Sequence, residues 1–215
     1  MNIISLPQSV TLVAVTKTLP VSVIEEAYAH GVRHFGENYV EEFAEKYAQL
    51  PDEIKQHAIF HMIGHMQSRK VKRAVELFDW VDSVDTVGLA QKLDEAAGNL
   101  HKKLYTLFQI NVSGETGKSG FRHVSMLPCE HMPYKHVVAK GLMTMPPAVK
   151  NPEDNRAIFK SLKSFSKTLR IKCPALGSVL SMGTSQDYQV AIEEGATMVR
   201  LGTVLFGERN NPIIQ

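Results

Sequence analysis

Leu12-Val13-Ala14-Val15-Thr16-Lys17 is an unbroken apolar run that ends on a lysine. Near-continuous apolar runs of this length are typical of strands in a parallel sheet that is covered on both faces. Further runs of the same kind recur along the chain, so we predict eight strands in all. They are Val10–Thr16, Val32–Phe35, Ala58–Ile63, Asp79–Ser83, Lys103–Val112, His136–Thr144, Leu176–Ser181 and Thr197–Leu201.

Helical patterns lie between most of these strands. The predicted helices are Val21–His30, Val40–Leu50, Gln67–Leu77, Val87–Ala97, Asp154–Arg170 and Gln186–Gly195, with a short last helix that opens at Thr203. The segment Phe121–Lys135 is not expected to form a helix, because two prolines interrupt it.

Alternation of strands and helices indicates βαβ units and a parallel sheet. Eight such units in 215 residues predict a single α/β domain, a (β/α)8 TIM barrel over residues 1–215. A doubly wound open sheet is the alternative. Its first turn is usually rich in glycine, whereas the turn after the first strand here is Lys17-Thr18-Leu19-Pro20.

Composition excludes several classes of protein. The 24 basic and 22 acidic residues give a net charge of +2, which argues against nucleic-acid binding. Two cysteines without a C-x-x-C motif give little support to a metal site. The chain has no run of 18 apolar residues and no basic start before an apolar run, so we expect no membrane span or signal peptide and a cytoplasmic protein.

The first strand has no predicted helix before it, so one side of the barrel is expected to be thinly covered. A monomer and a weak homodimer are both compatible with that feature.

Barrels carry their functional groups at the C-terminal ends of the strands. Small polar residues follow the seventh and eighth predicted strands, a place where barrels commonly bind phosphate through backbone N–H groups and hydroxyls. The candidates are Ser181, Gly183, Ser185, Arg200, Gly202 and Thr203. Ordinary turns are the alternative, because glycine and serine are common there.

Lys17 is the second candidate for chemistry. An amine at the rim of an apolar pocket loses its proton easily and becomes a nucleophile toward carbonyl groups. A lysine that extends into solvent is the alternative. A Schiff-base lysine together with a phosphate site is the combination that pyridoxal 5′-phosphate requires.

A series of segments resembles the pyridoxal phosphate homeostasis proteins, which are related to the N-terminal barrel of alanine racemase. The resemblance runs in order over roughly residues 10–209. Its segments are Leu12–Lys17, His34–Val40, Phe60–Gln67, Asp82–Asp85, Asn111–Glu115, Lys118–Phe121, Gly141–Met143, Leu180–Ser185, Ala191–Thr197, Val199–Thr203 and Phe206–Arg209.

The resemblance implies a fold-type III pyridoxal phosphate barrel. It implies that Lys17 forms the Schiff base and that Arg200 faces the pyridine nitrogen of the cofactor. The remaining predicted cofactor-binding residues are Ser185, Gly202 and Thr203, which it places at the phosphate, Asn38 and His61, which it places around the ring, and Ser181.

The resemblance also implies little catalysis. An arginine is always charged and leaves the ring nitrogen unprotonated, so the cofactor is a weak electron sink. Alanine racemase takes a second base from a further domain, for which this chain is too short. The implied function is therefore storage of pyridoxal phosphate and its delivery to apo-enzymes, without an assigned catalytic residue. A racemase-like enzyme on the same cofactor is the alternative.

Other patterns suggest rival functions. Gly114–Ser119 looks like a phosphate-binding P-loop but is two residues too short. His61 and His65 have the spacing of a helical zinc pair, although they lie at a predicted strand end. The basic run Gln67–Arg73 is expected to be a solvated helix face, and a docking patch for an acidic partner is its alternative. Asp82 is expected to serve in a turn or helix cap.

Overall fold

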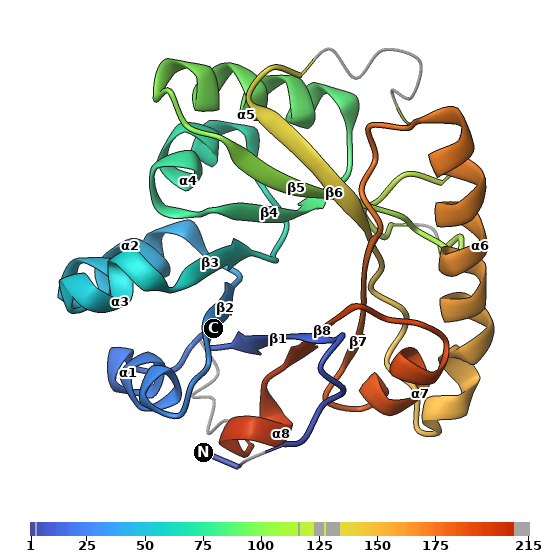
Figure 1. The fold of residues 1–215 in the computed structure, drawn as a ribbon, viewed down its shortest axis with the longest axis horizontal. Helices are drawn as coiled ribbons and strands as arrows, with labels where there is room; N and C mark the ends of the chain where they lie inside the picture. Colours follow the sequence, from blue (N-terminus) through green and yellow to red (C-terminus); the bar gives the residue numbers. More distant parts are fainter. Residues whose placement is uncertain (3, 116, 123–126, 128–133, 209–215) are drawn as a thin grey trace.

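The computed structural model describes residues 1–2, 4–115, 117–122, 127 and 134–208. Within them the strands pair in sequence order into one closed barrel (Figure 1), and each strand runs parallel to its neighbours. The strands are β1 (Thr11–Val15), β2 (His34–Glu37), β3 (Ile59–Met62), β4 (Trp80–Val84), β5 (Leu104–Gln109), β6 (Val137–Met143), β7 (Val179–Thr184) and β8 (Met198–Leu201). The predicted barrel is confirmed.

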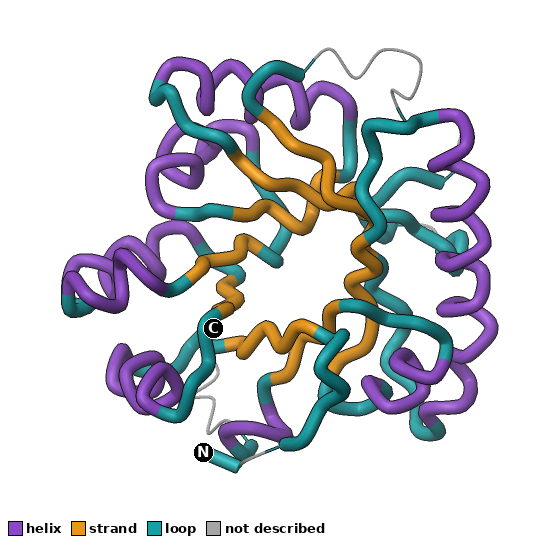
Figure 2. The backbone as a smooth tube through the Cα atoms, viewed as in Figure 1, coloured by secondary structure: helices purple, strands orange, loops and turns teal. Residues whose placement is uncertain are grey.

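The helices lie outside the ring of strands (Figure 2). They are α1 (Val21–Ala29), α2 (Val40–Gln49), α3 (Asp52–His57), α4 (Val71–Leu77), α5 (Val87–Asn99), α6 (Arg156–Lys172), α7 (Tyr188–Glu193) and α8 (Thr203–Phe206), with 3-10 turns η1 (Ser68–Lys70) and η4 (Pro152–Asn155). Sequence analysis missed α3. Pro51 before it and two acidic residues in its first turn are its start signals.

Three predicted strands, β2, β5 and β7, differ from the observed boundaries by two residues or more, and β5 ends at Gln109 rather than at the predicted Val112. β2 begins two residues later than predicted and includes Glu37, which sequence analysis placed in the following loop. β7 extends beyond Ser181 to Thr184. Gly183 made this extension look like a turn in the sequence, because glycine is common in turns. In the structure Gly183 has a φ of +94°, and a Cβ on it would lie 2.6 Å from the Cβ of Ala191 on α7. Close packing of α7 therefore requires glycine inside this strand.

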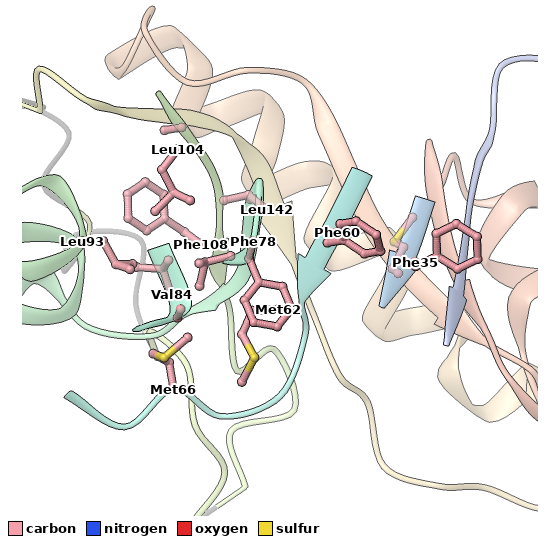
Figure 3. Packing of buried hydrophobic residues seen from close by; sticks show 14 of the residues in the cluster. Phe35, Phe60, Met62, Met66, Phe78, Val84, Leu93, Leu104, Phe108 and Leu142 are labelled. Atoms are coloured by element: carbon pink, nitrogen blue, oxygen red, sulfur yellow. The ribbon is translucent and has the colours of Figure 1, made fainter. Parts of the chain in front are cut away.

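The hydrophobic core has two parts. One fills the barrel interior with Val13, Trp80, Leu107, Met143 and Met198. The larger part lies between the strands and the surrounding helices, where buried aromatic and aliphatic side chains pack together (Figure 3). The Phe43 ring on α2 lies 4.9 Å from the ring of Phe60 and 4.7 Å from that of Phe78. These contacts hold α2 against the barrel wall.

The described helices include none with the length and apolarity that crossing a membrane demands. Most of the predicted non-helical segment Phe121–Lys135 lies outside the described residues.

Candidate functional site

A pocket of about 250 Å³ lies at the C-terminal end of the barrel, where several strand ends and their following loops meet. Its lining includes six of the eight predicted cofactor-binding residues, and no aspartate or glutamate is among the described residues that line it. The lining residues are Val15, Lys17, Asn38, Ile63, Met145, Thr184, Ser185, Gln186, Arg200, Gly202 and Thr203. The charged side chains of this lining are thus both cationic, which favours an anionic ligand.

Arg200 lines the pocket, and hydrogen bonds hold its side chain in place. The residue is buried on β8, and its Nη1 donates a hydrogen bond to Ser181 Oγ at 2.5 Å. Its Nη2 donates to the carbonyl oxygen of Thr144 at 2.8 Å and lies 2.9 Å from Met145 Sδ. Burial lowers the pKa of the guanidinium, while the carboxylates of Asp82 and Asp187 oppose that effect. Arginine stays charged under such conditions, so the pocket has a fixed positive charge.

Ser181 is absent from the described lining of the pocket. It lies inside β7, fully buried, and its hydroxyl accepts the hydrogen bond from Arg200. The contact fixes the guanidinium, so Ser181 acts on the pocket through Arg200 rather than by facing a ligand.

Ser185 joins the loop after β7 to the start of α8. Its Oγ accepts hydrogen bonds from the backbone N–H groups of Gly202 at 3.0 Å and Val204 at 3.3 Å. Asp187 stabilises the same loop, because its Oδ1 accepts a hydrogen bond from the Thr184 N–H at 2.7 Å. The Ser185 hydroxyl and the backbone of Gly202 therefore lie together in the lining of the pocket, and such hydroxyl and N–H groups are typical of anion-binding sites.

Lys17 is the second residue after the end of β1 and is half-buried. The next residue, Thr18, has a φ of +61°, in the left-handed region that a β-branched residue rarely adopts. Strain of this kind costs on the order of 1–3 kcal/mol and persists only where the surrounding structure enforces it. The backbone beside Lys17 is therefore held in an uncommon conformation.

His61 is not among the described residues that line the pocket. It is fully buried, its Nδ1 lies 3.1 Å from Asp82 Oδ1, and its ring stacks on Trp80 at 5.1 Å. Its Nε2 lies 2.9 Å from Nδ1 of His34. His61 thus belongs to a hydrogen-bonded chain inside the barrel.

The assignment of Asp82 to a turn or helix cap was wrong. Its carboxylate is buried against His61, and Thr86 instead caps α5 by accepting the N–H of Leu89 at 3.2 Å. Burial, with His61 beside it, lowers the pKa of His34 to about 4, so this imidazole is neutral near pH 7.

Five further residues line the pocket without having been predicted as site residues, namely Val15, Ile63, Met145, Thr184 and Gln186. Gln186 lines it after β7, and Met145 is 45% exposed and lines the pocket beside Arg200. The position of Met145, two residues after the end of β6, could have predicted its place in the pocket, because residues just after a barrel strand lie at the C-terminal face.

The rival patterns have local explanations in the structure. In the P-loop-like segment, Asn111 Nδ2 donates to the carbonyl oxygens of Glu115 and Lys118, and Lys118 pairs with Glu115 at 2.8 Å. In the basic run, Lys70 pairs with Glu41, and Arg73 pairs with Glu76 at 2.8 Å. Among the described residues no group of three or more His, Cys, Asp or Glu side chains is placed to hold a metal ion.

A (β/α)8 barrel with a lysine after the first strand and an anion cradle after the last two defines the class of the alanine racemase barrel. The family model "Alanine racemase, N-terminal domain" accordingly matches residues 3–210. Alanine racemase of Clostridium difficile shares this fold, with a TM-score of 0.78 at 15% identity over 96% of this chain and 55% of the enzyme.

More similar proteins narrow the assignment. The pyridoxal phosphate homeostasis protein of Vibrio alginolyticus is 39% identical over 95% of this chain and 88% of its own. The one from Synechocystis is 40% identical over 96% and 95%. The chain belongs to the pyridoxal phosphate homeostasis protein family. The structure of PipY from Synechococcus elongatus with PLP bound has a TM-score of 0.84 and 38% identity, over 94% of each chain.

Proposed function

We propose that this chain binds pyridoxal 5′-phosphate covalently at Lys17, stores it and delivers it to apo-enzymes that require it. One observation carries the proposal. Lys17, the buried Arg200 and the Ser185–Gly202 cradle line a single pocket of about 250 Å³. The names of the relatives and the PLP-bound PipY structure support the same function.

The residues of the pocket fit this cofactor, which has an aldehyde, a pyridine ring and a phosphate. When bound, it supplies an aldehyde that condenses with a primary amine and releases water. Lys17 provides that amine. The hydroxyl of Ser185, which accepts the N–H groups of Gly202 and Val204 in this structure, provides a donor for a phosphate. Thr203 adds a second hydroxyl to the same end of the pocket.

Arg200 has a different role in the proposal. Ser181 and the Thr144 carbonyl oxygen fix its guanidinium, which cannot accept a proton or give one up at ordinary pH. A ring nitrogen that faces Arg200 therefore stays unprotonated. Asn38 lines the same pocket and completes its wall on the side of β2.

Delivery is tested by transfer. The protein is loaded with pyridoxal phosphate, freed of unbound cofactor and mixed with an apo-aminotransferase. We expect the recovered aminotransferase activity to match the loss of the visible absorbance of the donor protein. A protein that takes up no cofactor, or that keeps all of it in the presence of the apo-enzyme, would contradict the proposal.

Ser185→Ala is expected to weaken the binding of pyridoxal phosphate by about 1–3 kcal/mol, the scale of a hydrogen bond to a charged group. Binding of pyridoxal, which lacks the phosphate, is expected to change little. Both affinities are measurable by absorbance titration. Ser161→Ala is the control, because that hydroxyl bonds only to its own helix at the Ala157 carbonyl. Equal weakening for the two ligands would place Ser185 away from the phosphate.

The racemase alternative requires two bases, one on each face of the substrate. Among the described lining residues the amine of Lys17 is the one side-chain group that can serve as a general base. A missing general base commonly costs 10²–10⁴-fold in rate. We therefore expect the loaded protein to invert L-alanine more slowly than about 1 s⁻¹, the low end of ordinary turnover, in a chiral assay. Faster inversion would favour the racemase over the carrier.

A further inference from the structure

A polar cluster lies next to Lys17, outside the pocket itself; three of its residues are buried, and the Glu42 side chain is 27% exposed. We call it the Lys46 cluster, and its members are Thr16, Glu37, Glu42 and Lys46. Lys46 Nζ lies 2.9 Å from Glu37 Oε1 and 2.6 Å from Glu42 Oε1. Thr16 Oγ1 donates to the same Glu37 oxygen at 2.8 Å. The cluster therefore joins α2 to the ends of β1 and β2.

The cluster contacts the backbone on both sides of Lys17. Lys46 Nζ also donates to the carbonyl oxygen of Thr16 at 2.9 Å, and Glu42 Oε1 accepts the backbone N–H of Thr18 at 2.6 Å. The ammonium group of Lys46 thus donates hydrogen bonds to Glu37 and to the Thr16 carbonyl oxygen, and it forms an ion pair with Glu42. Residues 16 and 18 are bound to one helix, and Lys17 lies between them.

This arrangement explains the uncommon backbone of Thr18. A threonine keeps a φ of +61° only where contacts with its surroundings hold the backbone in that conformation. The charge-assisted hydrogen bond from its N–H to Glu42 is such a constraint. A second constraint is on Thr16, so the chain direction through Lys17 is set from both ends.

Stability alone gives little reason for burying these charges. Buried ion pairs seldom stabilise a fold more than apolar residues of similar volume would, and Glu37 Oε2 has no hydrogen-bond partner here. Such polar contacts are instead expected where supporting residues must fix the position of a reactive side chain.

We propose that Glu42 and Lys46 are positioning residues, which hold the backbone of residues 16–18 so that the Lys17 amine meets the cofactor aldehyde in a reactive orientation. This inference rests on the proposed function. The step it favours forms the bond from Lys17 Nζ to the aldehyde carbon, and the aldehyde oxygen leaves as water. Neither Glu42 nor Lys46 lines the described pocket, so their effect passes through the backbone.

Glu42→Ala tests the proposal, with Glu41→Ala as its matched control. Glu41 is on the same helix turn but pairs with Lys70 at the surface. In Glu42→Ala we expect covalent attachment of pyridoxal phosphate at Lys17, followed by visible absorbance, to slow about tenfold, the scale of one charge-assisted hydrogen bond. Affinity for pyridoxamine 5′-phosphate, which has no aldehyde, is expected to stay within twofold. Glu42→Gln keeps an acceptor oxygen and should restore most of the rate.

A second readout needs no cofactor. Hydrogen exchange of the Thr18 amide, measured on the cofactor-free protein, is expected to speed up about tenfold in Glu42→Ala and to stay unchanged in Glu41→Ala. Equal attachment rates and equal exchange in the two variants would overturn the positioning role. If wild-type protein attaches no cofactor at all, the proposed function fails, while the Thr18 exchange still decides whether Glu42 holds this backbone.

Discussion

Replacing Lys17 with alanine is expected to abolish covalent attachment of pyridoxal phosphate to this chain. Lys17 is the one primary amine among the described residues that line the pocket, and the guanidinium of Arg200 does not replace it as a nucleophile. Weaker binding is expected to remain, because the Ser185 hydroxyl and the Gly202 N–H do not depend on the lysine.

Two measurements check this expectation: the visible absorbance of the loaded variant, and its intact mass after treatment with borohydride. Lys92→Ala is the control, because Lys92 is exposed on α5, away from the pocket. A Lys17→Ala protein that still gains the mass of one cofactor after reduction would show that another lysine forms the bond.

Replacing Lys46 with methionine is expected to lower the free energy of unfolding by about 3–5 kcal/mol at pH 7, the usual consequence of removing one partner of a buried ion pair. The substitution leaves the Glu37 carboxylate fully buried without its counter-charge. Lys70→Met is the control. It breaks the surface pair with Glu41, and such pairs contribute at most about 1 kcal/mol.

The loss in Lys46→Met has a defined dependence on pH. Burial raises the pKa of Glu37, and Lys46 opposes that rise, so the variant raises this pKa further in the folded protein. The unfolded chain keeps an ordinary glutamate, which has a pKa of about 4.3. Stability is therefore lost as the pH rises from the unfolded pKa through the folded one, and it returns when acid protonates Glu37 in both states.

Urea unfolding at pH 7 and pH 5 measures this difference. We expect the gap between Lys46→Met and wild type to narrow at pH 5, and the additional change Glu37→Gln to recover part of the loss at pH 7. A gap of equal size at both pH values would contradict the assignment of the effect to Glu37.

The sequence predicted the barrel because its determining features are local. The apolar run of β1 and the alternation of strands with helices are readable residue by residue. The same holds for Lys17, Ser185 and Gly202, because parallel strands in a barrel end at one face and bring their following loops together.

The buried polar contacts were not predictable in this way. His34, His61 and Asp82 meet because β2, β3 and β4 have particular registers and turn these side chains into the barrel, and a one-residue slip would reverse every side chain. Lys46 lies among Glu41, Glu42 and Glu45 in the sequence, a pattern typical of a solvated helix face. Only the packing of α2 against β1 and β2 shows that Lys46 is buried.

The most direct measurement is a peptide map of the wild-type protein, loaded with pyridoxal phosphate, reduced with borohydride and digested. We expect one cofactor per chain, attached to the peptide that contains Lys17. A cofactor attached mainly to another lysine such as Lys118, or no adduct at all, would contradict the proposal that Lys17 holds the cofactor in this pocket.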